Sequence, residues 1–182
     1  MSEKIEEVVK DENKVLKIFK ELLPYIIILI VVVVIRTFFV TPIIVSGDSM
    51  NPTLKDGEVM ILNKMGKIER FGIIVIEAEI EKNGKIEKED IIKRVIALPG
   101  EVVSCENGVI YLNDRVLEGD EYGSGTTPDF PRTQLKDNEY FVLGDNRQNS
   151  MDSQELGPFN VEKVKGTTNF TLFPFNKFGK VK

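Results

Sequence analysis

The sequence predicts a mainly β fold, in which a single N-terminal transmembrane helix is followed by a compact antiparallel β domain. Residues 22–45 contain Arg36 as their only charge, and a helix that spans a bilayer needs about 20 apolar residues. Most of the remaining chain consists of short segments rich in β-branched residues and bounded by turn residues, a pattern typical of strands. At 182 residues the chain is long enough for one domain with a substantial core.

The N-terminal part predicts an uncleaved membrane anchor. Residues 1–21 contain both signs of charge and are expected to form a short, solvated helix in the cytoplasm, and residues 22–40 the transmembrane helix. Arg36 can reach the headgroups if it lies near the membrane exit. No small-x-small cleavage site follows the apolar run. The lysines at 14, 17 and 20 favour a cytoplasmic N-terminus, so residues 41–182 are expected outside the cytoplasm.

The β domain is predicted from strand and hairpin signals. Strands are expected at residues 58–62, 72–77, 91–96 and 139–143, and residues 166–175 are expected to close the sheet. Asn83-Gly84 and Asn107-Gly108 indicate tight hairpins, the second of which pairs residues 101–105 with 109–112. Residues 117–136, rich in turn-forming residues, predict an exposed loop. Beyond the anchor we expect no helix except a possible turn near residues 161–165.

Composition excludes several classes of site. The formal net charge of −5 argues against nucleic acid as a partner. The single cysteine, Cys105, cannot form an internal disulfide and is expected to be an ordinary strand residue. The chain contains no histidine, which disfavours a zinc site and rules out a Ser-His-Asp triad. No metal or cofactor is therefore expected.

Residues 46–54, directly after the apolar run, form the first candidate site. Ser49 lies between Asp48 and Met50, and a stiff Asn-Pro-Thr unit follows. By itself this stretch fits a loop leaving a membrane helix about as well as a nucleophile. A nucleophilic serine in a chain without histidine needs another base, and lysine is the known substitute.

Lys93 is the lysine whose surroundings differ from those of the others. A lysine in water has a pKa of about 10.4, and a general base near neutral pH needs a pKa of about 7–8, which burial can produce. Most lysines lie in charged runs, whereas Lys93 lies within the apolar segment 91–96. Strand alternation places it on one face with Ile91 and Val95. The alternative is an inward-facing lysine that protects an edge strand from aggregation.

Residues 144–153 form a third polar cluster, which alone could be an ordinary turn. In chain order the three clusters contain Gly47-Asp48-Ser49-Met50, then Lys93-Arg94-Val95-Ile96, then Gly144-Asp145-Asn146-Arg147 with Ser150 and Asp152-Ser153. This order, after one membrane anchor, resembles the bacterial type I signal peptidases in their short, Gram-positive-like form. The resemblance extends over nearly the whole chain.

The resemblance implies a role for each matching residue. Ser49 would be the nucleophile and Lys93 the general base, with the Ser49 N–H as an oxyanion donor. Ser150 would orient the lysine amine, and Arg94 and Asp145 would form a supporting ion pair. Asp152 would belong to the same supporting shell.

Three positions depart from the family pattern. Gly47 stands where many relatives have a serine that acts as a second oxyanion donor, and we treat it as a variant common in the short forms. Gln154 replaces an arginine often paired with the Asp152 position, which weakens any structural role for Asp152. Gly72 replaces an aspartate that often begins the strand.

The resemblance also implies the substrate and the membrane as partners. A preprotein's signal segment is an apolar membrane helix followed by an extended small-x-small segment. We expect that segment to bind as a strand beside Ser49, while Pro52, Leu54 and the aromatic residues of segment 170–178 line the lower rim or dip into the lipid. Two alternatives remain: a self-cleaving, repressor-type Ser-Lys protease, which the anchor and the acidic charge disfavour, and an inactive relative that serves as a membrane-bound binding module.

Overall fold

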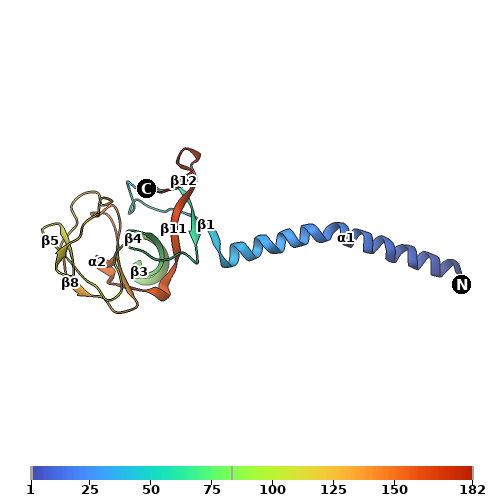
Figure 1. The fold of residues 1–182 in the computed structure, drawn as a ribbon, viewed down its shortest axis with the longest axis horizontal. Helices are drawn as coiled ribbons and strands as arrows, with labels where there is room; N and C mark the ends of the chain where they lie inside the picture. Colours follow the sequence, from blue (N-terminus) through green and yellow to red (C-terminus); the bar gives the residue numbers. More distant parts are fainter. Residues whose placement is uncertain (1, 83, 182) are drawn as a thin grey trace. The chain divides into compact units, whose positions relative to one another are not determined.

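The structure is a computed structural model that describes the backbone of residues 2–82 and 84–181 and the side chains of residues 17–82 and 84–181. The chain divides into two compact units, Met1–Phe39 and Val40–Lys182. The first unit is helical and the second is mainly antiparallel β (Figure 1). The predicted fold class is confirmed.

The first unit contains a single continuous helix, α1 (Ser2–Phe38), in the described residues. The charged N-terminal residues are helical as expected, and they continue without a break into the apolar run of the same helix. Within it, Lys17–Phe38 is long and apolar enough to cross a membrane. The helix ends at Phe38, and Pro42 disfavours a helical conformation for Thr41, which lies in the strand that follows.

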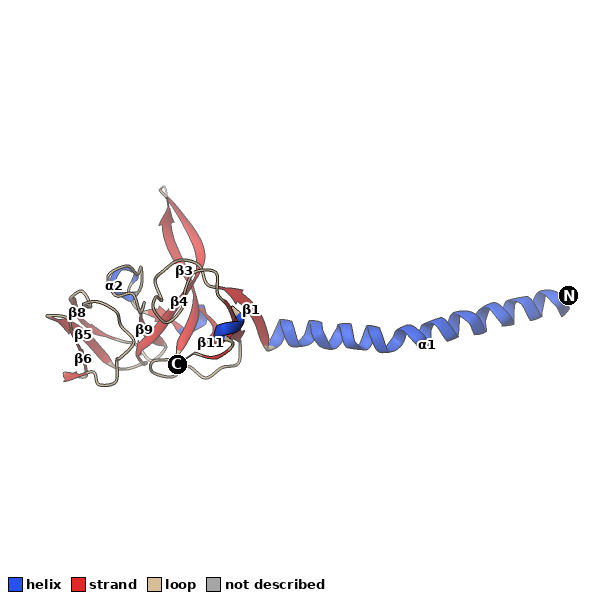
Figure 2. Ribbon diagram, turned by 90° about the horizontal axis from the view of Figure 1, so that it is seen from above, coloured by secondary structure: helices blue, strands red, loops and turns tan. Residues whose placement is uncertain are grey.

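The larger sheet of the second unit is antiparallel throughout its described pairs. Its strands follow one another in space in the order β1 (Val40–Ile44), β2 (Val59–Asn63), β11 (Val164–Phe173), β3 (Ile73–Lys82), β4 (Lys85–Ala97), β9 (Glu139–Leu143) and β10 (Phe159–Asn160), with β12 (Gly179–Lys180) paired to β11. The β3–β4 hairpin extends beyond the rest of the β unit (Figure 2). Gly84 lies in its turn with φ of +75°, and Asn83 lies outside the described residues.

The smaller sheet has the order β7 (Arg115–Val116), β6 (Val109–Leu112), β5 (Val102–Glu106), β8 (Phe130–Gln134). Its β5–β6 hairpin confirms the prediction made from Asn107-Gly108, whose φ angles of 53° and 78° are those a type I′ turn requires. Cys105 is buried in β5 as a strand residue.

Two expectations about the β unit were wrong. Residues 117–136 are not wholly an exposed loop, because β8 forms within them and buries Phe130, whose ring stacks on Phe141 with centroids 4.8 Å apart. A short helix, α2 (Ser153–Leu156), also forms where none was expected. Asp152 caps it by accepting a hydrogen bond from the Gln154 N–H. Four residues are too few for a helical apolar period to be visible in the sequence.

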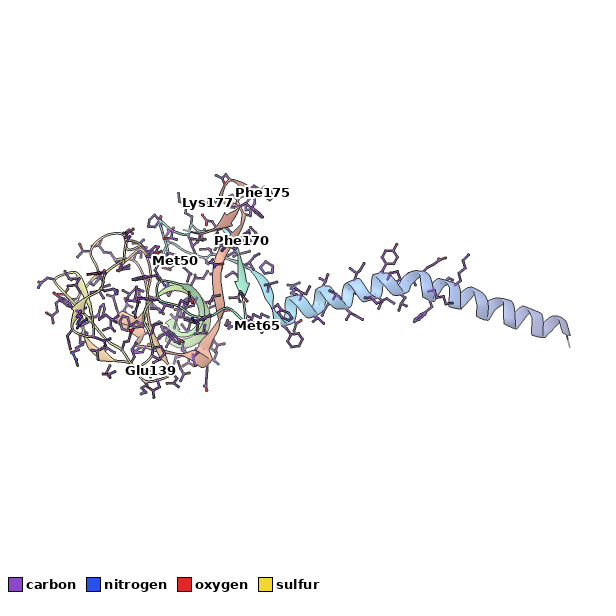
Figure 3. The ribbon with its side chains drawn as sticks, viewed as in Figure 1. Met50, Met65, Glu139, Phe170, Phe175 and Lys177 are labelled. Carbon is purple, nitrogen blue, oxygen red and sulfur yellow. The ribbon has the colours of Figure 1, made fainter. Side chains whose placement is uncertain are left out.

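Two 3₁₀ turns complete the described elements, η1 (Val161–Lys163) and η2 (Phe175–Lys177). The first confirms the turn expected near residues 161–165. The second follows β11, and Figure 3 shows Phe175 and Lys177 together in this terminal loop.

One apolar cluster of the β unit determines where the first candidate segment lies. Its buried residues come from the loop between β1 and β2, from β2 and from β3: Val45, Met50, Leu54, Met60 and Ile73. Met50 and Leu54 are one helical turn apart, and the Leu54 N–H donates to the Met50 carbonyl at 2.9 Å. Because these neighbours of Ser49 are buried, the loop that contains the serine has a fixed place on the sheet.

Candidate active site

Ser49 lies in the loop that joins β1 to β2, and both ends of this loop are tied together. The Val45 N–H donates to the Glu58 carbonyl at 2.8 Å, and the Gly57 N–H donates to the Val45 carbonyl at 2.9 Å. Met50 beside the serine is buried, whereas Ser49 itself is half-buried. The packing of Met50 therefore leaves the serine hydroxyl at the edge of the core.

Lys93 on β4 approaches the same hydroxyl. Its Nζ lies 2.7 Å from Ser49 Oγ, and the lysine is only 3 % exposed. Burial lowers the pKa of Lys93 to about 8, because removal from water disfavours the charged amine, while the carboxylates of Asp152 and Asp145 act in the opposite direction. A lysine with this pKa has an appreciable neutral fraction near physiological pH and can accept a proton.

Arg94, the next residue of β4, faces the opposite side and forms a buried ion pair with Asp145. Its Nε and Nη2 donate to the two carboxylate oxygens at 2.7 and 2.6 Å. The guanidinium also donates to the Phe71 carbonyl at 2.6 Å and lies over the Tyr122 ring, 3.7 Å from its centroid. The strand alternation expected for residues 91–96 thus places Lys93 on the face with Ser49 and Arg94 on the face with Asp145.

The loop that follows β9 approaches Ser49 through backbone and side-chain groups. The Asn146 N–H donates to the Ser49 carbonyl at 3.0 Å, and Asn146 Nδ2 donates to the Asp48 carbonyl at 3.2 Å. Gly144 has no room for a side chain, because a Cβ there would lie 2.5 Å from the Ser49 carbonyl and 2.2 Å from Ser150 Oγ. This contact explains the glycine at the start of the third motif.

Arg147 holds this loop from within the protein. It is buried, donates to the Gly144 carbonyl at 3.1 Å and to Thr127 Oγ1 at 2.9 Å, and forms an ion pair with Asp120 at 2.8 Å. The sequence analysis assigned no role to Arg147 or Asn146. Their signal in the sequence is their place in the third motif, Gly144-Asp145-Asn146-Arg147.

The remaining residues expected at the site lie around this centre. Asp152 is buried and accepts from the Gly144 N–H at 2.9 Å as well as capping α2. Ser150 Oγ is buried and has no hydrogen-bond partner among the described residues, so no bond to the lysine amine is seen. Gln154 lies in α2, and its backbone N–H donates to the Asp152 carboxylate at 3.1 Å.

The two glycines that depart from the motif have definite surroundings. Gly47 has φ of +82°, with open space where a Cβ would be, and its N–H donates to Asp56 Oδ1 at 2.8 Å. Another residue at this position would be strained by its positive φ, although its side chain would meet no neighbouring atom. At Gly72, a Cβ would lie 2.9 Å from the Glu69 carbonyl, so this turn requires a close approach of backbone.

A cavity of about 140 Å³ adjoins the serine and the lysine. Its lining comes from the end of β1 and the following loop and from the middle of β4: Ile44, Val45, Ser46, Ser49, Met50, Glu89, Asp90, Ile91, Ile92 and Lys93. In the described residues, β9 pairs with β4 over Arg94–Ala97, beyond the part that lines the cavity. The cavity therefore lies between two strand segments, next to Ser49 and Lys93.

The donors at this site suit proton transfer and nucleophilic attack. Within residues 17–82 and 84–181, no group of three or more Asp, Glu, Cys or His side chains is placed to hold a metal ion. The hydroxyl of Ser49 and the amine of Lys93 are in hydrogen-bond contact, and a neutral amine can take the hydroxyl proton as the oxygen attacks.

Comparisons with known proteins find signal peptidases among the similar sequences. A family model described as signal peptidase, peptidase S26, matches residues 18–173. A signal peptidase I of Bacillus licheniformis is 35 % identical, with 94 % of this chain and 97 % of that protein aligned. Signal peptidase I T of Bacillus subtilis is 35 % identical, with 86 % of each chain aligned. A crystal structure of a signal peptidase I from Enterococcus faecalis matches with a TM-score of 0.47 and 28 % identity, over 56 % of this chain and 97 % of that one.

Proposed function

The chain belongs to the peptidase S26 family of signal peptidases, and from this premise we propose that Ser49 and Lys93 form the catalytic dyad with which it removes signal peptides from preproteins. The enzyme is a serine endopeptidase, as its family membership shows. The observation that supports the dyad is the 2.7 Å contact between Lys93 Nζ and Ser49 Oγ, together with a lysine pKa lowered to about 8.

In the proposed acylation step, Ser49 Oγ attacks the carbonyl carbon of the scissile peptide bond while neutral Lys93 takes its proton. The tetrahedral intermediate then collapses, and the lysine ammonium gives that proton to the leaving amine of the mature protein. Water next attacks the serine ester as Lys93 accepts one of its protons. As the second tetrahedral intermediate collapses, the ester bond to Ser49 Oγ breaks and the Lys93 ammonium gives its proton to Oγ, which regenerates the hydroxyl and the neutral amine; the signal peptide leaves as a carboxylic acid that ionises in water.

We propose supporting roles for five further residues. Arg94 and Asp145 hold β4 against the loop that contains Asn146, and Asp152 holds that loop through the Gly144 N–H. The buried, unpartnered hydroxyl of Ser150 is available to the lysine amine during proton transfer. Gly47 leaves the space beside Ser49 open for substrate.

The preprotein segment binds in the cavity between β1 and β4 as an additional strand. Strand addition at an unpaired edge uses main-chain hydrogen bonds, and shallow pockets select the alternate side chains. A cavity of about 140 Å³ between Ile44 and Ile92 suits small side chains at these positions. A preprotein with bulky residues at both small positions should remain uncut, and efficient cleavage of it would contradict this binding mode.

The first test is cleavage of a model preprotein in detergent micelles by the full chain. Ser49→Ala and Lys93→Ala should each abolish cleavage, because nucleophile and base act as a unit. Lys85→Ala, on the exposed end of the same strand, should cleave like the parent and serves as the matched control. Cleavage by Ser49→Ala at the parental rate would overturn the dyad, and an inert parent would favour an inactive, membrane-bound relative.

For the membrane we propose that residues 1–21 are cytoplasmic, residues 22–40 span the bilayer and residues 41–182 lie outside. The support is the lysines at 14, 17 and 20, which precede the uncharged apolar stretch that begins at residue 22 within the candidate span Lys17–Phe38. The test uses a membrane-impermeant maleimide on intact cells, in a Cys105→Ser background. A cysteine at Lys85 should be labelled and one at Ser2 should not, and the reverse pattern would contradict the orientation.

A further inference from the structure

One residue, Asn146, holds the two carbonyl groups on either side of the Ser49 α-carbon. Its side-chain Nδ2 donates to the Asp48 carbonyl at 3.2 Å, and its backbone N–H donates to the Ser49 carbonyl at 3.0 Å. The acceptor of the first bond is a carbonyl oxygen, so the amide must present its NH₂ group and not its oxygen. Both peptide planes that flank the nucleophile are therefore fixed by a single residue.

The first of these peptides determines where the Ser49 N–H points. The cis peptide bonds of the described residues are at Asn51-Pro52 and Phe173-Pro174, so the Asp48–Ser49 bond is trans. In a planar trans peptide the C=O and the N–H point in opposite directions. A donor on the Asp48 carbonyl thus fixes the direction of the Ser49 N–H, and it also polarises the peptide and strengthens that N–H as a donor.

The Ser49 N–H donates no hydrogen bond to another group in the described residues, so it is available to a ligand. We propose that Asn146 is a positioning residue that aims and polarises the Ser49 N–H toward the oxyanion formed during peptide cleavage. The inference rests on the proposed function of Ser49 as the nucleophile. It assigns to Asn146 a role that acts through the peptide backbone, without contact between its side chain and substrate.

The neighbouring residues make this positioning important. Gly47 has no side-chain donor, and its own N–H donates to Asp56 Oδ1 at 2.8 Å. Neither group of Gly47 can therefore join the Ser49 N–H in binding an oxyanion. Asn146 is in turn held firmly: it forms a bridge to Ser124 and follows Asp145, whose carboxylate is paired with Arg94. A donor fixed in advance needs no reorganisation when charge develops, which is the condition for effective oxyanion stabilisation.

The test compares Asn146→Ala with the parent in preprotein cleavage. The variant keeps the backbone bond to the Ser49 carbonyl and loses the side-chain bond to Asp48. We expect kcat to fall about 10- to 100-fold with KM little changed, because loss of an oxyanion donor costs about 10²–10³ and a misaligned one costs less. The pH midpoint of activity should not move, since Lys93 is untouched. Gln148→Ala, an exposed neighbour in the same loop, is the matched control and should behave like the parent.

A pair of inhibitors separates positioning from a general loss of structure. A small-x-small peptide that ends in an aldehyde forms a tetrahedral adduct with the serine and places an oxyanion at the Ser49 N–H. The same peptide ending in an alcohol cannot form this adduct. Asn146→Ala should weaken the aldehyde by the same factor as kcat/KM and leave the alcohol unchanged.

Equal weakening of both inhibitors, or an unchanged kcat, would overturn the role of Asn146. This result is independent of the test of the dyad. If the parent cleaves the preprotein and Ser49→Ala does not, the proposed function holds whatever Asn146→Ala does. If Asn146→Ala fails to fold, Asn146→Asp provides the same comparison, since its carboxylate has the same size but cannot donate to the Asp48 carbonyl when ionised.

Discussion

Arg94 and Asp145 form a bidentate ion pair that joins the strand of Lys93 to the loop of Asn146. The two bonds measure 2.7 and 2.6 Å, and the side chains are 4 % and 0 % exposed. Each member is adjacent in sequence to a residue that contacts Ser49 or its backbone: Lys93 before Arg94, and Asn146 after Asp145. The pair therefore fixes the distance between the two sides of the site.

Breaking this pair should lower both stability and activity. Asp145→Asn leaves the buried guanidinium without its counter-charge, and removal of one partner from a buried pair costs about 3–5 kcal/mol. We expect the free energy of unfolding to fall by an amount of this order and kcat to fall with it. Chemical denaturation and preprotein cleavage measure the two effects.

The matched control is Asp114→Asn, which breaks an exposed ion pair with Arg132 whose side chains are 59 % and 75 % exposed. Exposed pairs contribute about 0–1 kcal/mol, so this variant should resemble the parent. Equal effects of the two substitutions would show that the buried pair has no special structural role.

The rate of cleavage should rise with pH through the pKa of Lys93. As the proposed general base, this lysine would act in its neutral form, and its pKa is lowered to about 8 by burial, so the rate should increase up to that region and level off above it. At pH 7 about 9 % of the amine is neutral and at pH 9 about 90 %, a rise of about tenfold. The pH profile of kcat/KM measures it.

Asp152→Asn tests the cause of this pKa. The carboxylate of Asp152 opposes the effect of burial and keeps the pKa of Lys93 higher than burial alone would, so its removal should move the midpoint to lower pH. An unchanged midpoint, or a shift to higher pH, would contradict the assignment of this midpoint to Lys93.

Lys93→Met should stabilise the enzyme while it abolishes activity. Burial of the charged amine costs free energy, and the pKa of about 8 against an unfolded value of 10.5 corresponds to about 3 kcal/mol between protonation states. Between these two pH values the unfolded chain binds more protons than the folded protein, so the parent gains stability as pH rises from 8 to 10.5. Below pH 8 the free energy of unfolding of the parent does not include this increase.

The comparison with Lys93→Met isolates this group. The difference in the free energy of unfolding between variant and parent should be largest below pH 8 and shrink as pH approaches 10.5. Chemical denaturation across this range provides the values. A constant difference over the whole range would show that the lysine pKa is not lowered in the folded protein.

Gly144→Ala should inactivate the enzyme. The new Cβ would lie 2.2 Å from Ser150 Oγ and 2.5 Å from the Ser49 carbonyl, so the loop would have to move away from the nucleophile. A misplacement of about 1 Å can cost about 10² in rate, and we expect a loss of at least this size in kcat.

Gly157→Ala is the control for the general effect of a glycine substitution. Gly157 has φ of +78° and ψ of 180°, a conformation almost restricted to glycine, with nothing within 4 Å of a Cβ, so alanine there should cost about 1–3 kcal/mol of stability from backbone strain alone and leave kcat unchanged. Parental activity in Gly144→Ala would mean that the loop tolerates displacement from Ser49.

Several parts of this protein could be predicted from the sequence because they depend on local pattern. The apolar run that becomes the end of α1, the strand segments and the hairpin at Asn107-Gly108 all follow from periodicity and turn chemistry within a few residues. Strand β8 was missed because proline and polar residues surround Phe130, and its burial depends on the distant Phe141 ring. Helix α2 was missed because it is a single turn held by the Asp152 cap.

By itself, the sequence determined the chemistry that was possible: a chain without histidine, with Ser49 and Lys93 as the candidate nucleophile and base. Only the tertiary structure decided that they meet, because the 2.7 Å contact joins residues 44 positions apart through the pairing of β3 with β4 and the packing of Met50. The same holds for Asn146, which reaches a carbonyl 98 positions away. The physical reason is that a pKa, like the direction of a peptide N–H, depends on surroundings that distant segments supply once the sheet has formed.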